Sequence, residues 1–239
     1  MRHILNIEDL KNLSKKRVPR MFYDYADSGS WTEQTYRENQ EDFSKIKLKQ
    51  RVGINIAQRS TKTTMLGLPV ALPVALAPCG LTGMQCADGE ILAAKAAEKF
   101  NVPFTMSTLS ICSIEDVARH TKEPFWFQLY VMKDHSFSKK LIDRAKKADC
   151  SALMLTVDLQ ILGQRHKDIR NGLSTPPKLT VKNVINLMKY PKWCFNMIKT
   201  SRRSFRNIVG HVEGVSDISK LSAWVSEQFD PKLSWDDVA

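Results

Sequence analysis

The sequence predicts an α/β fold built from successive strand–helix units around a parallel sheet. Four apolar segments of strand length alternate with helical segments between residues 74 and 158, and this alternation is typical of parallel sheets. The last two of these strands also end in polar side chains, as in folds that place their sites at the carboxyl ends of strands. Such units wind right-handed into either a closed barrel or an open sheet.

Length, charge and cysteine content limit the class of protein. The 239 residues are enough for one large α/β domain or two small ones. The net charge of +11 favours an anionic partner: a phosphate, a carboxylate substrate, a lipid headgroup or nucleic acid. Five cysteines without metal-type spacing indicate a reducing compartment, and the longest apolar run, 68–78, is too short to span a bilayer. We therefore expect a cytoplasmic protein that does not cross a membrane.

The segment 7–28 predicts two short helices separated by Pro19, because its apolar residues recur at helical spacing and proline is accepted in a first helical turn. Tyr23 and Tyr25 are two residues apart, so they cannot share a helix face. One is expected to pack while the other points elsewhere. The alternative is that both are ordinary core or surface tyrosines.

The next segments predict a hairpin and the first strand–helix unit. Residues 63–77 alternate β-favouring residues with Gly and Pro, which indicates a short hairpin that leads into a strand at 74–77. The glycines of the loop 78–83 either let the backbone approach a flat ligand or only form turns. The Ala-rich segment 88–99 predicts a helix.

Three further strands follow, and the last two of them carry the candidate site. We expect strands at 103–107, 125–131 and 152–158, with helices at 113–120 and 136–147; Ser113 and the acidic residues after it form a capping-box pattern. The strand 152–158 is a nearly continuous apolar run and is expected to be covered on both faces. Because the carboxyl ends of parallel strands meet at one edge, the polar side chains at the ends of the last two strands predict one shared site. These side chains are Gln128, Tyr130, Thr156 and Asp158.

The segment 159–220 is expected to be a long irregular region rich in basic and aromatic residues. Between Asp168 and Glu213 no acidic residue occurs, whereas basic and aromatic residues interleave from 178 to 210. This composition suits an interfacial segment on anionic lipid, and the alternative is a solvated basic loop over the site. Nucleic-acid binding is not expected, because no recognised motif accompanies the charge. Near the end of the chain, Ser234 and the acidic residues after it predict the start of a helix that stops at Ala239, so we expect the front part of a larger barrel.

Five short motifs occur in order along the chain. They are Tyr23-Asp24-Tyr25, Leu76-Ala77-Pro78, Phe127-Gln128-Leu129-Tyr130, Leu155-Thr156-Val157-Asp158 and Gly163-Gln164-Arg165. Together they resemble the FMN-dependent L-2-hydroxy acid dehydrogenase and oxidase family, and most of all its bacterial, cytochrome-linked L-lactate dehydrogenase branch. The resemblance covers the whole chain. It implies a (β/α)8 TIM barrel, present here as about four βα units of one incomplete FMN domain spanning residues 1–239.

The resemblance also implies roles for individual residues. The backbone of Ala77, Pro78 and Cys79 and the side chains of Ser107, Gln128 and Thr156 would contact FMN. Tyr25 and Arg165 would bind the substrate carboxylate, Tyr130 would hydrogen-bond the substrate hydroxyl, and Asp158 would orient the catalytic base. The residue types are consistent with these roles, since arginine forms bidentate hydrogen bonds with carboxylates and phenols stabilise negative charge on oxygen. Leu109, where glycolate oxidase has tryptophan, favours lactate as the substrate. No metal site is expected.

The implied partners are a 2-hydroxy acid, an electron acceptor of the respiratory chain, an anionic membrane surface at 178–210 on the inner face of the cell membrane, and further copies of the chain. The family's catalytic histidine, its flavin-stabilising lysine and its phosphate-binding loops match no part of this sequence, and neither His166 nor His211 lies in the matching motif. The chain alone is therefore expected to be inactive. Two alternatives remain open: a non-catalytic half-barrel relic that binds membrane surfaces, and one half of a split enzyme.

Overall fold

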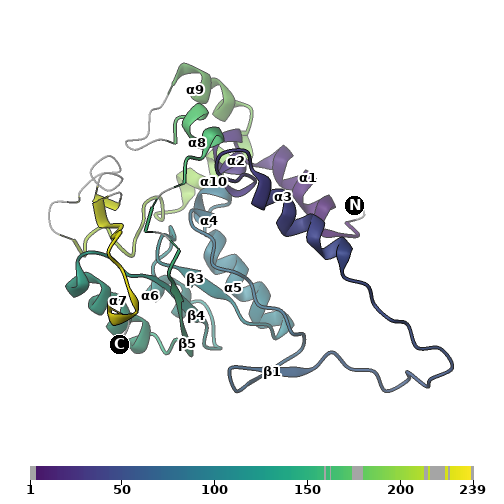
Figure 1. Cartoon of the computed structure of the whole chain (residues 1–239). Coiled ribbons are helices and arrows are strands. Elements are labelled where there is room, and N and C mark those ends of the chain that lie inside the picture. Colours follow the sequence, from purple (N-terminus) through teal and green to yellow (C-terminus); the bar gives the residue numbers. More distant parts are fainter. Residues whose placement is uncertain are drawn as a thin grey trace.

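The computed structural model of the protein describes residues 4–158, 160–161, 163–173, 180–212, 215, 224–225 and 227–237. A parallel sheet of three strands forms its centre (Figure 1). The strands are β3 (Thr105–Ser107), β4 (Trp126–Tyr130) and β5 (Ala152–Thr156), in the order β3-β4-β5. The expectation of these three strands and of their parallel direction is confirmed.

Helices connect these strands and cover the sheet. They are α5 (Gly89–Phe100) before β3, α6 (Ile114–Ala118) between β3 and β4, and α7 (His135–Lys147) between β4 and β5. The main core joins them to the sheet through Met106, Phe127, Phe137 and Leu141, each no more than 1% exposed. The predicted capping box of α6 is present: the Ser113 hydroxyl accepts from the Asp116 N–H at 3.1 Å, and the Asp116 carboxylate accepts from the Ser113 N–H at 2.9 Å.

Two predictions about strands are wrong. The segment 74–77 forms only a single parallel bridge, between Leu76 and Phe104, because Pro73 and Pro78 flank it and cannot donate to a ladder. The strand β5 is not covered on both faces: Leu153 is 46% exposed. In the part of the chain that the structure describes, β5 pairs only with β4, so it is an edge strand.

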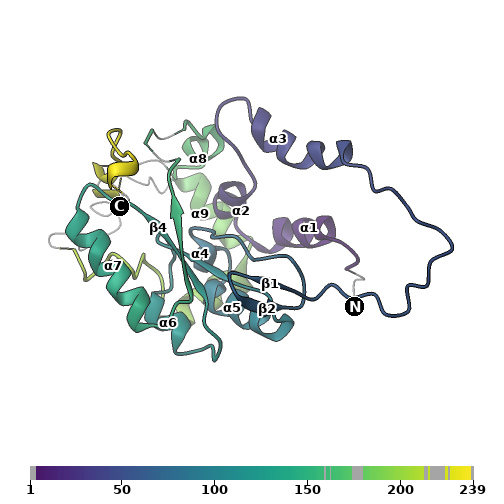
Figure 2. The same ribbon diagram turned by 60° about the horizontal axis from the view of Figure 1, so that its bottom comes forward.

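The N-terminal segment forms the helices α1 (Ile7–Arg17), α2 (Arg20–Ala26) and α3 (Gln34–Glu41) and the short 3-10 helix η1 (Asp42–Lys45). Pro19 separates the first two, as predicted. The buried face of α2 packs on the short helix α4 (Thr82–Gln85) and on later helices, and Phe22 stacks on Trp193 with ring centroids 5.4 Å apart. Figures 1 and 2 show α1 and α3 on the opposite side of the sheet from α6 and α7. Residues 46–62 then form an exposed extended arm without helix or strand.

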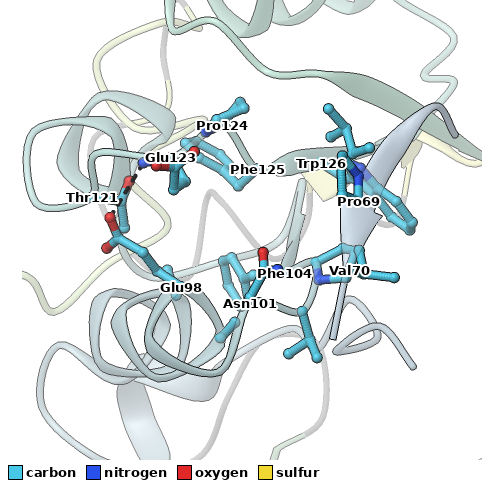
Figure 3. A pocket seen from close by; sticks show the side chains of 15 residues that line it. Pro69, Val70, Glu98, Asn101, Phe104, Thr121, Glu123, Pro124, Phe125 and Trp126 are labelled. Carbon is cyan, nitrogen blue, oxygen red and sulfur yellow. Dashed lines mark hydrogen bonds between the residues drawn. The ribbon is translucent and has the colours of Figure 1, made fainter. Parts of the chain in front are cut away.

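The predicted hairpin consists of β1 (Thr63–Met65) and β2 (Leu68–Val70) and lies beside the amino-terminal ends of β3 and β4. Its turn uses Leu66 and Gly67, both with positive φ (47° and 81°). Together with α5 it borders a cavity of about 150 Å³ next to Phe104 and Phe125 (Figure 3). Because the cavity lies at the amino ends of the strands, it is remote from the polar strand ends.

The expectation of an irregular region after β5 is partly wrong. Among the described residues of this region lie the helices α8 (His166–Arg170), α9 (Val181–Met188) and α10 (Pro191–Lys199). Thr180 caps α9 by accepting from the Asn183 N–H, and Pro191 occupies the first turn of α10. Residues 178–179 of the basic segment, like residues 159, 162, 174–177, 213–214 and 216–220, lie outside the described residues. The predicted cap at Ser234 begins η2 (Trp235–Asp237). Over the described residues, no helix combines the length and the hydropathy that a membrane span needs.

Candidate active site at the carboxyl ends of the strands

Polar side chains form a hydrogen-bonded row across the ends of the three strands. Gln128 is the centre of this row and is fully buried. Its Nε2 donates to Thr156 Oγ1 at 2.8 Å, and its Oε1 accepts from Ser107 Oγ at 3.1 Å. The ladder pairs Ser107 with Gln128 and Tyr130 with Thr156, so the sheet register places these side chains next to one another. The structure therefore brings together Ser107, Gln128 and Thr156, the three side chains that the resemblance assigns to FMN.

The loop before α4 approaches the same edge. Ala77 and Cys79 are exposed and Pro78 is half-buried, so the backbone of these residues is accessible. The Leu81 N–H donates to the Leu109 carbonyl at 3.1 Å, which attaches this loop to the one after β3.

Tyr25 reaches this loop from α2. A Cβ atom on Gly80 would lie 3.0 Å from the Tyr25 hydroxyl, so the absence of a side chain at Gly80 permits the approach. Tyr23, by contrast, is buried on α2 and donates to Asp27 Oδ2 at 2.7 Å. The prediction that the two tyrosines face different surroundings is confirmed.

Tyr130 lies at the end of β4 and is half-buried. Burial, reinforced by the nearby Tyr25 and Asp158, raises the pKa of Tyr130 to about 12. Burial also raises the pKa of Tyr25, although the Arg165 guanidinium opposes this shift. Both phenols are therefore protonated at neutral pH, and each can donate a hydrogen bond to an anionic or polar ligand.

Arg165 lies just before α8 and its guanidinium is held on three sides. Its Nε lies 2.7 Å from Asp168 Oδ2, and its Nη2 donates to Ser28 Oγ at 3.0 Å and to the Tyr25 carbonyl oxygen. Its Cζ also lies 4.7 Å from the centroid of the Tyr25 ring. Tyr25 and Arg165, which the resemblance assigns to the substrate carboxylate, thus lie in contact. Asp158 is exposed two residues beyond β5, close enough to Tyr130 to affect its pKa.

Three residues that support this site were not identified from the sequence. Asp168 is 8% exposed and anchors Arg165; burial raises its pKa. Glu90 is buried in the first turn of α5, where its Oε1 accepts from the Gly83 and Ile111 N–H groups, both at 2.9 Å. Asn207 is fully buried and donates to the carbonyl oxygens of the loop after β3. Only Asp168 had a sequence indication, its i,i+3 spacing from Arg165.

Comparison with known proteins identifies relatives of this chain. The sequence model of a family described as FMN-dependent dehydrogenase matches residues 14–239. The chain is 38% identical over 236 residues to an L-lactate dehydrogenase of Acinetobacter baylyi and 39% identical over 236 residues to one of Haemophilus influenzae. These alignments cover 98% of this chain but 61% and 62% of the relatives, so the chain spans about three fifths of their length.

Solved structures agree with the sequence relatives. The monotopic membrane protein (S)-mandelate dehydrogenase superimposes with a TM-score of 0.90 at 29% identity, over 98% of this chain and 62% of that one. A lactate oxidase of Pediococcus acidilactici described as putative matches 78% of this chain and 52% of its own, with a TM-score of 0.66 and 33% identity. These neighbours are TIM-barrel flavoenzymes, and the three-stranded parallel sheet with its helices is a part of that barrel. The match over residues 14–239 and the relatives' shared architecture establish that the chain belongs to the FMN-dependent dehydrogenase family.

Proposed function

We propose that this chain forms the flavin- and substrate-facing part of an enzyme that oxidises an L-2-hydroxy acid, most specifically L-lactate, to the 2-keto acid. One observation supports the proposal most directly. The hydrogen-bonded row Ser107–Gln128–Thr156 lies at the same strand ends as Tyr130. Tyr25 lies near enough to Tyr130 to help raise its pKa. The relatives named L-lactate dehydrogenase support the choice of substrate. So does Leu109, which stands where glycolate oxidase has tryptophan.

The residues present fit FMN. A flat heteroaromatic ring needs donors and acceptors along its edge and an accessible backbone against its face. The buried amide of Gln128 and the hydroxyls of Ser107 and Thr156 provide the first, and the backbone of residues 77–79 provides the second. When bound, FMN supplies the two-electron acceptor for the oxidation. The protein holds and orients it.

The tyrosines and the arginine fit a 2-hydroxy acid. The Arg165 guanidinium stacks on Tyr25, so the two can bind one carboxylate together. The protonated Tyr130 phenol would donate to the substrate's hydroxyl oxygen and stabilise charge that develops there. Asp158 would steady the cation that forms when a histidine takes the hydroxyl proton. That histidine matches no position in this sequence, so the complete reaction requires the part of the family's fold that corresponds to the remaining length of the relatives.

We further propose that the chain alone binds FMN without completing the reaction. The two alternatives are a non-catalytic relic and one half of a split enzyme. The test is the visible absorbance of the purified chain after it is mixed with FMN and then with L-lactate under anaerobic conditions. We expect bound flavin that stays oxidised. Bleaching of the bound flavin by L-lactate would disprove the proposed inactivity. Failure of the chain to bind FMN would contradict the proposed FMN site. A second polypeptide that supplies the missing histidine and restores bleaching would identify a split enzyme.

A membrane-surface role is favoured by α9 and α10. These helices carry large exposed apolar side chains, with Val181 at 78%, Met188 at 75%, Phe195 at 56% and Ile198 at 70% exposure. Basic side chains alternate with them, which suits the interface of an anionic bilayer. We propose that this surface attaches the intact enzyme, as a homo-oligomer, to the inner face of the cell membrane, where electrons pass to the respiratory chain.

The membrane proposal is tested by co-sedimentation with vesicles of phosphatidylcholine with and without phosphatidylglycerol. We expect binding only to the anionic vesicles, weakening as salt rises. The double variant Phe195→Ser/Ile198→Ser should lose most of this binding. The variant Leu66→Ser, which removes a 72% exposed apolar side chain far from α9 and α10, serves as the control. Equal binding by both variants would contradict the proposed surface.

A further inference from the structure

Three arginines converge on the buried carboxylate of Asp116, a residue of α6. Asp116 is 1% exposed. Its Oδ1 lies 2.9 Å from Arg119 Nη2 and 3.3 Å from Arg202 Nε, and its Oδ2 lies 3.2 Å from Arg206 Nε. Arg202 also pairs with Asp88 at 3.0 Å. Three guanidinium groups thus face two carboxylates, which leaves one positive charge in the cluster.

The Asp116 carboxylate is saturated by these contacts. Besides the guanidinium groups, it accepts from the Ser113 N–H at 2.9 Å. Burial acts to raise the pKa of Asp116, but the Ser113 N–H and the three arginines lower it on balance, so Asp116 is ionised at neutral pH. Arg119 and Arg206 make no other side-chain hydrogen bond within the described residues, so their remaining N–H groups are available to a ligand.

An open hollow of about 450 Å³ lies next to this cluster, between α6 and residues 201–211. We call it the α6 pocket; its lining is Ser113, Glu115, Arg119, Ser201, Ser204, Arg206, Val209 and His211. Arg119 is 64% exposed, so its guanidinium is accessible from solvent. The hydroxyls of Ser201 and Ser204 line the same wall.

The one acidic side chain of this lining is already paired. Glu115 binds Arg144 through two contacts, at 2.7 Å from Nε and 2.8 Å from Nη2. The Arg144 hydrogen bonds are the main reason that the pKa of Glu115 falls to about 2. The pKa of His211 is lowered, mainly by burial and to a smaller extent by the Arg144 guanidinium. The electrostatics of the pocket therefore favour an anion.

We propose that the α6 pocket binds a phosphate group, as a monoester or diester. Guanidinium groups match the oxygens of phosphate geometrically, and serine hydroxyls donate to the remaining oxygens. A phosphate would also take up the surplus positive charge of the cluster. The site is separate from the row at the strand ends and does not depend on flavin binding.

The phosphate group has two sources, a soluble phosphate compound or a phospholipid headgroup. The pocket's wall continues directly from α10, whose Ile198 and Phe195 are exposed. Arg203 follows α10 in the chain and donates to the Ile198 and Thr200 carbonyls. These bonds attach the segment that lines the pocket to the end of α10. The same phosphate chemistry fits both sources, so the experiment contains one arm for each.

The first arm titrates the full chain with inorganic phosphate at constant ionic strength and follows binding by calorimetry, with chloride as the reference anion. We expect saturable binding by the natural chain, and about tenfold weaker binding by Arg119→Gln. Lys122→Gln, the same change of charge on an exposed residue outside the pocket, should bind as the natural chain does. The double variant Ser201→Ala/Ser204→Ala keeps every charge and removes only hydroxyl donors, so it should bind about threefold to tenfold more weakly.

The second arm measures binding to vesicles of phosphatidylcholine containing phosphatidylglycerol. If the ligand is a headgroup, Arg119→Gln reduces vesicle binding more than Lys122→Gln does, and inorganic phosphate competes. If the ligand is soluble, both variants bind vesicles alike while Arg119→Gln still loses phosphate. Unfolding midpoints in urea, taken in parallel, identify any variant that has lost its fold. No saturable phosphate binding by the natural chain, or equal binding by folded Arg119→Gln and Lys122→Gln, would overturn the proposal.

Discussion

Gln128 and Thr156 lie on neighbouring parallel strands and are joined by a 2.8 Å hydrogen bond from the Gln128 amide nitrogen to the Thr156 hydroxyl. The oxygen of the same amide accepts from Ser107 on the strand on the other side. One fully buried side chain thus links the ends of three strands. A ligand edge that contacts all three would find its partners already in place, which reduces the entropy lost on binding.

Replacing Gln128 by methionine should destabilise the chain and weaken FMN binding. Methionine has a similar size but removes the hydrogen bonds of the Ser107 and Thr156 hydroxyls to the amide. Ser107 keeps its contact with the Leu109 N–H, and a buried polar group left unsatisfied costs about 1–3 kcal/mol. Urea unfolding and a flavin titration measure the two effects. Thr156→Val, at the half-buried edge strand, should lose less stability while also weakening FMN binding. Unchanged FMN affinity in both folded variants would refute the proposed role of the row.

The Tyr130 phenol should titrate near pH 12. Its folded pKa lies above the ordinary value of 10, so the protonated phenol is the form favoured by the fold. The resulting stabilisation is present below about pH 10 and is lost as the pH rises towards 12. In Tyr130→Phe, the phenolate absorbance change above pH 11 should decrease by one tyrosine. Tyr130→Phe should also weaken binding of pyruvate, the 2-keto acid product, because the phenol would donate to the product's oxygen. Tyr23→Phe, whose phenol also has a pKa of about 12, should show the same absorbance decrease without weakening that binding.

The Glu115–Arg144 ion pair should contribute to acid sensitivity. The pKa of Glu115 falls to about 2, so the stabilisation from the pair is present above the ordinary pKa of 4.5 and is lost as the pH falls towards 2. Glu115→Gln removes this titration while Arg144 keeps its 2.9 Å bond to the Asn207 carbonyl. Its urea midpoint should therefore fall less than that of the natural chain between about pH 5 and pH 3. If the urea midpoint fell equally with pH in both proteins, the ion pair would make no contribution to the pH dependence of stability.

Asn207→Asp should loosen the loop after β3. The Asn207 amide nitrogen donates to Ser110 Oγ at 3.0 Å and to the Thr108 carbonyl at 3.3 Å, while its oxygen accepts from the Ile114 N–H at 3.0 Å. Aspartate keeps the acceptor and loses both donations. We expect a loss of about 1–3 kcal/mol in the free energy of unfolding and weaker FMN binding.

The matched control is Asn196→Asp, the same chemical change on the half-buried side of α10. It should leave both quantities within about 0.5 kcal/mol of the natural chain. If the two variants behave alike, Asn207 does not position the loop.

The sequence predicted the parts of the fold in which local chemistry and the tertiary environment agree. The capping box at Ser113 and the proline between α1 and α2 depend on neighbouring residues alone. The polar ends of β4 and β5 follow from their position in the sheet, because carboxyl ends of parallel strands meet. Tyr25 and Arg165, far apart in sequence, were paired only through the family resemblance.

The rest required contacts that sequence patterns do not encode. The coverage of β5 depends on which neighbours pack on it, so an apolar run was not enough to predict its exposure. The helices α9 and α10 are short, and basic residues interrupt their apolar residues in the sequence. The helical spacing of the apolar residues was therefore not recognised. Asn207 and Asp116 gain their importance from partners that are distant in sequence or converge from different segments, which no local pattern reports.

The extended arm at residues 46–62 makes one part of the chain easy to cut. It is exposed throughout and contains Lys47, Lys49, Arg51, Arg59 and Lys62, which are cleavage points for trypsin. A single cut there would separate α1, α2 and α3 from the sheet covalently. The N-terminal fragment would stay bound, because Phe22 stacks on Trp193 and Arg165 contacts the Tyr25 ring. A nicked chain would thus migrate as two fragments under denaturing conditions and as one particle under native conditions.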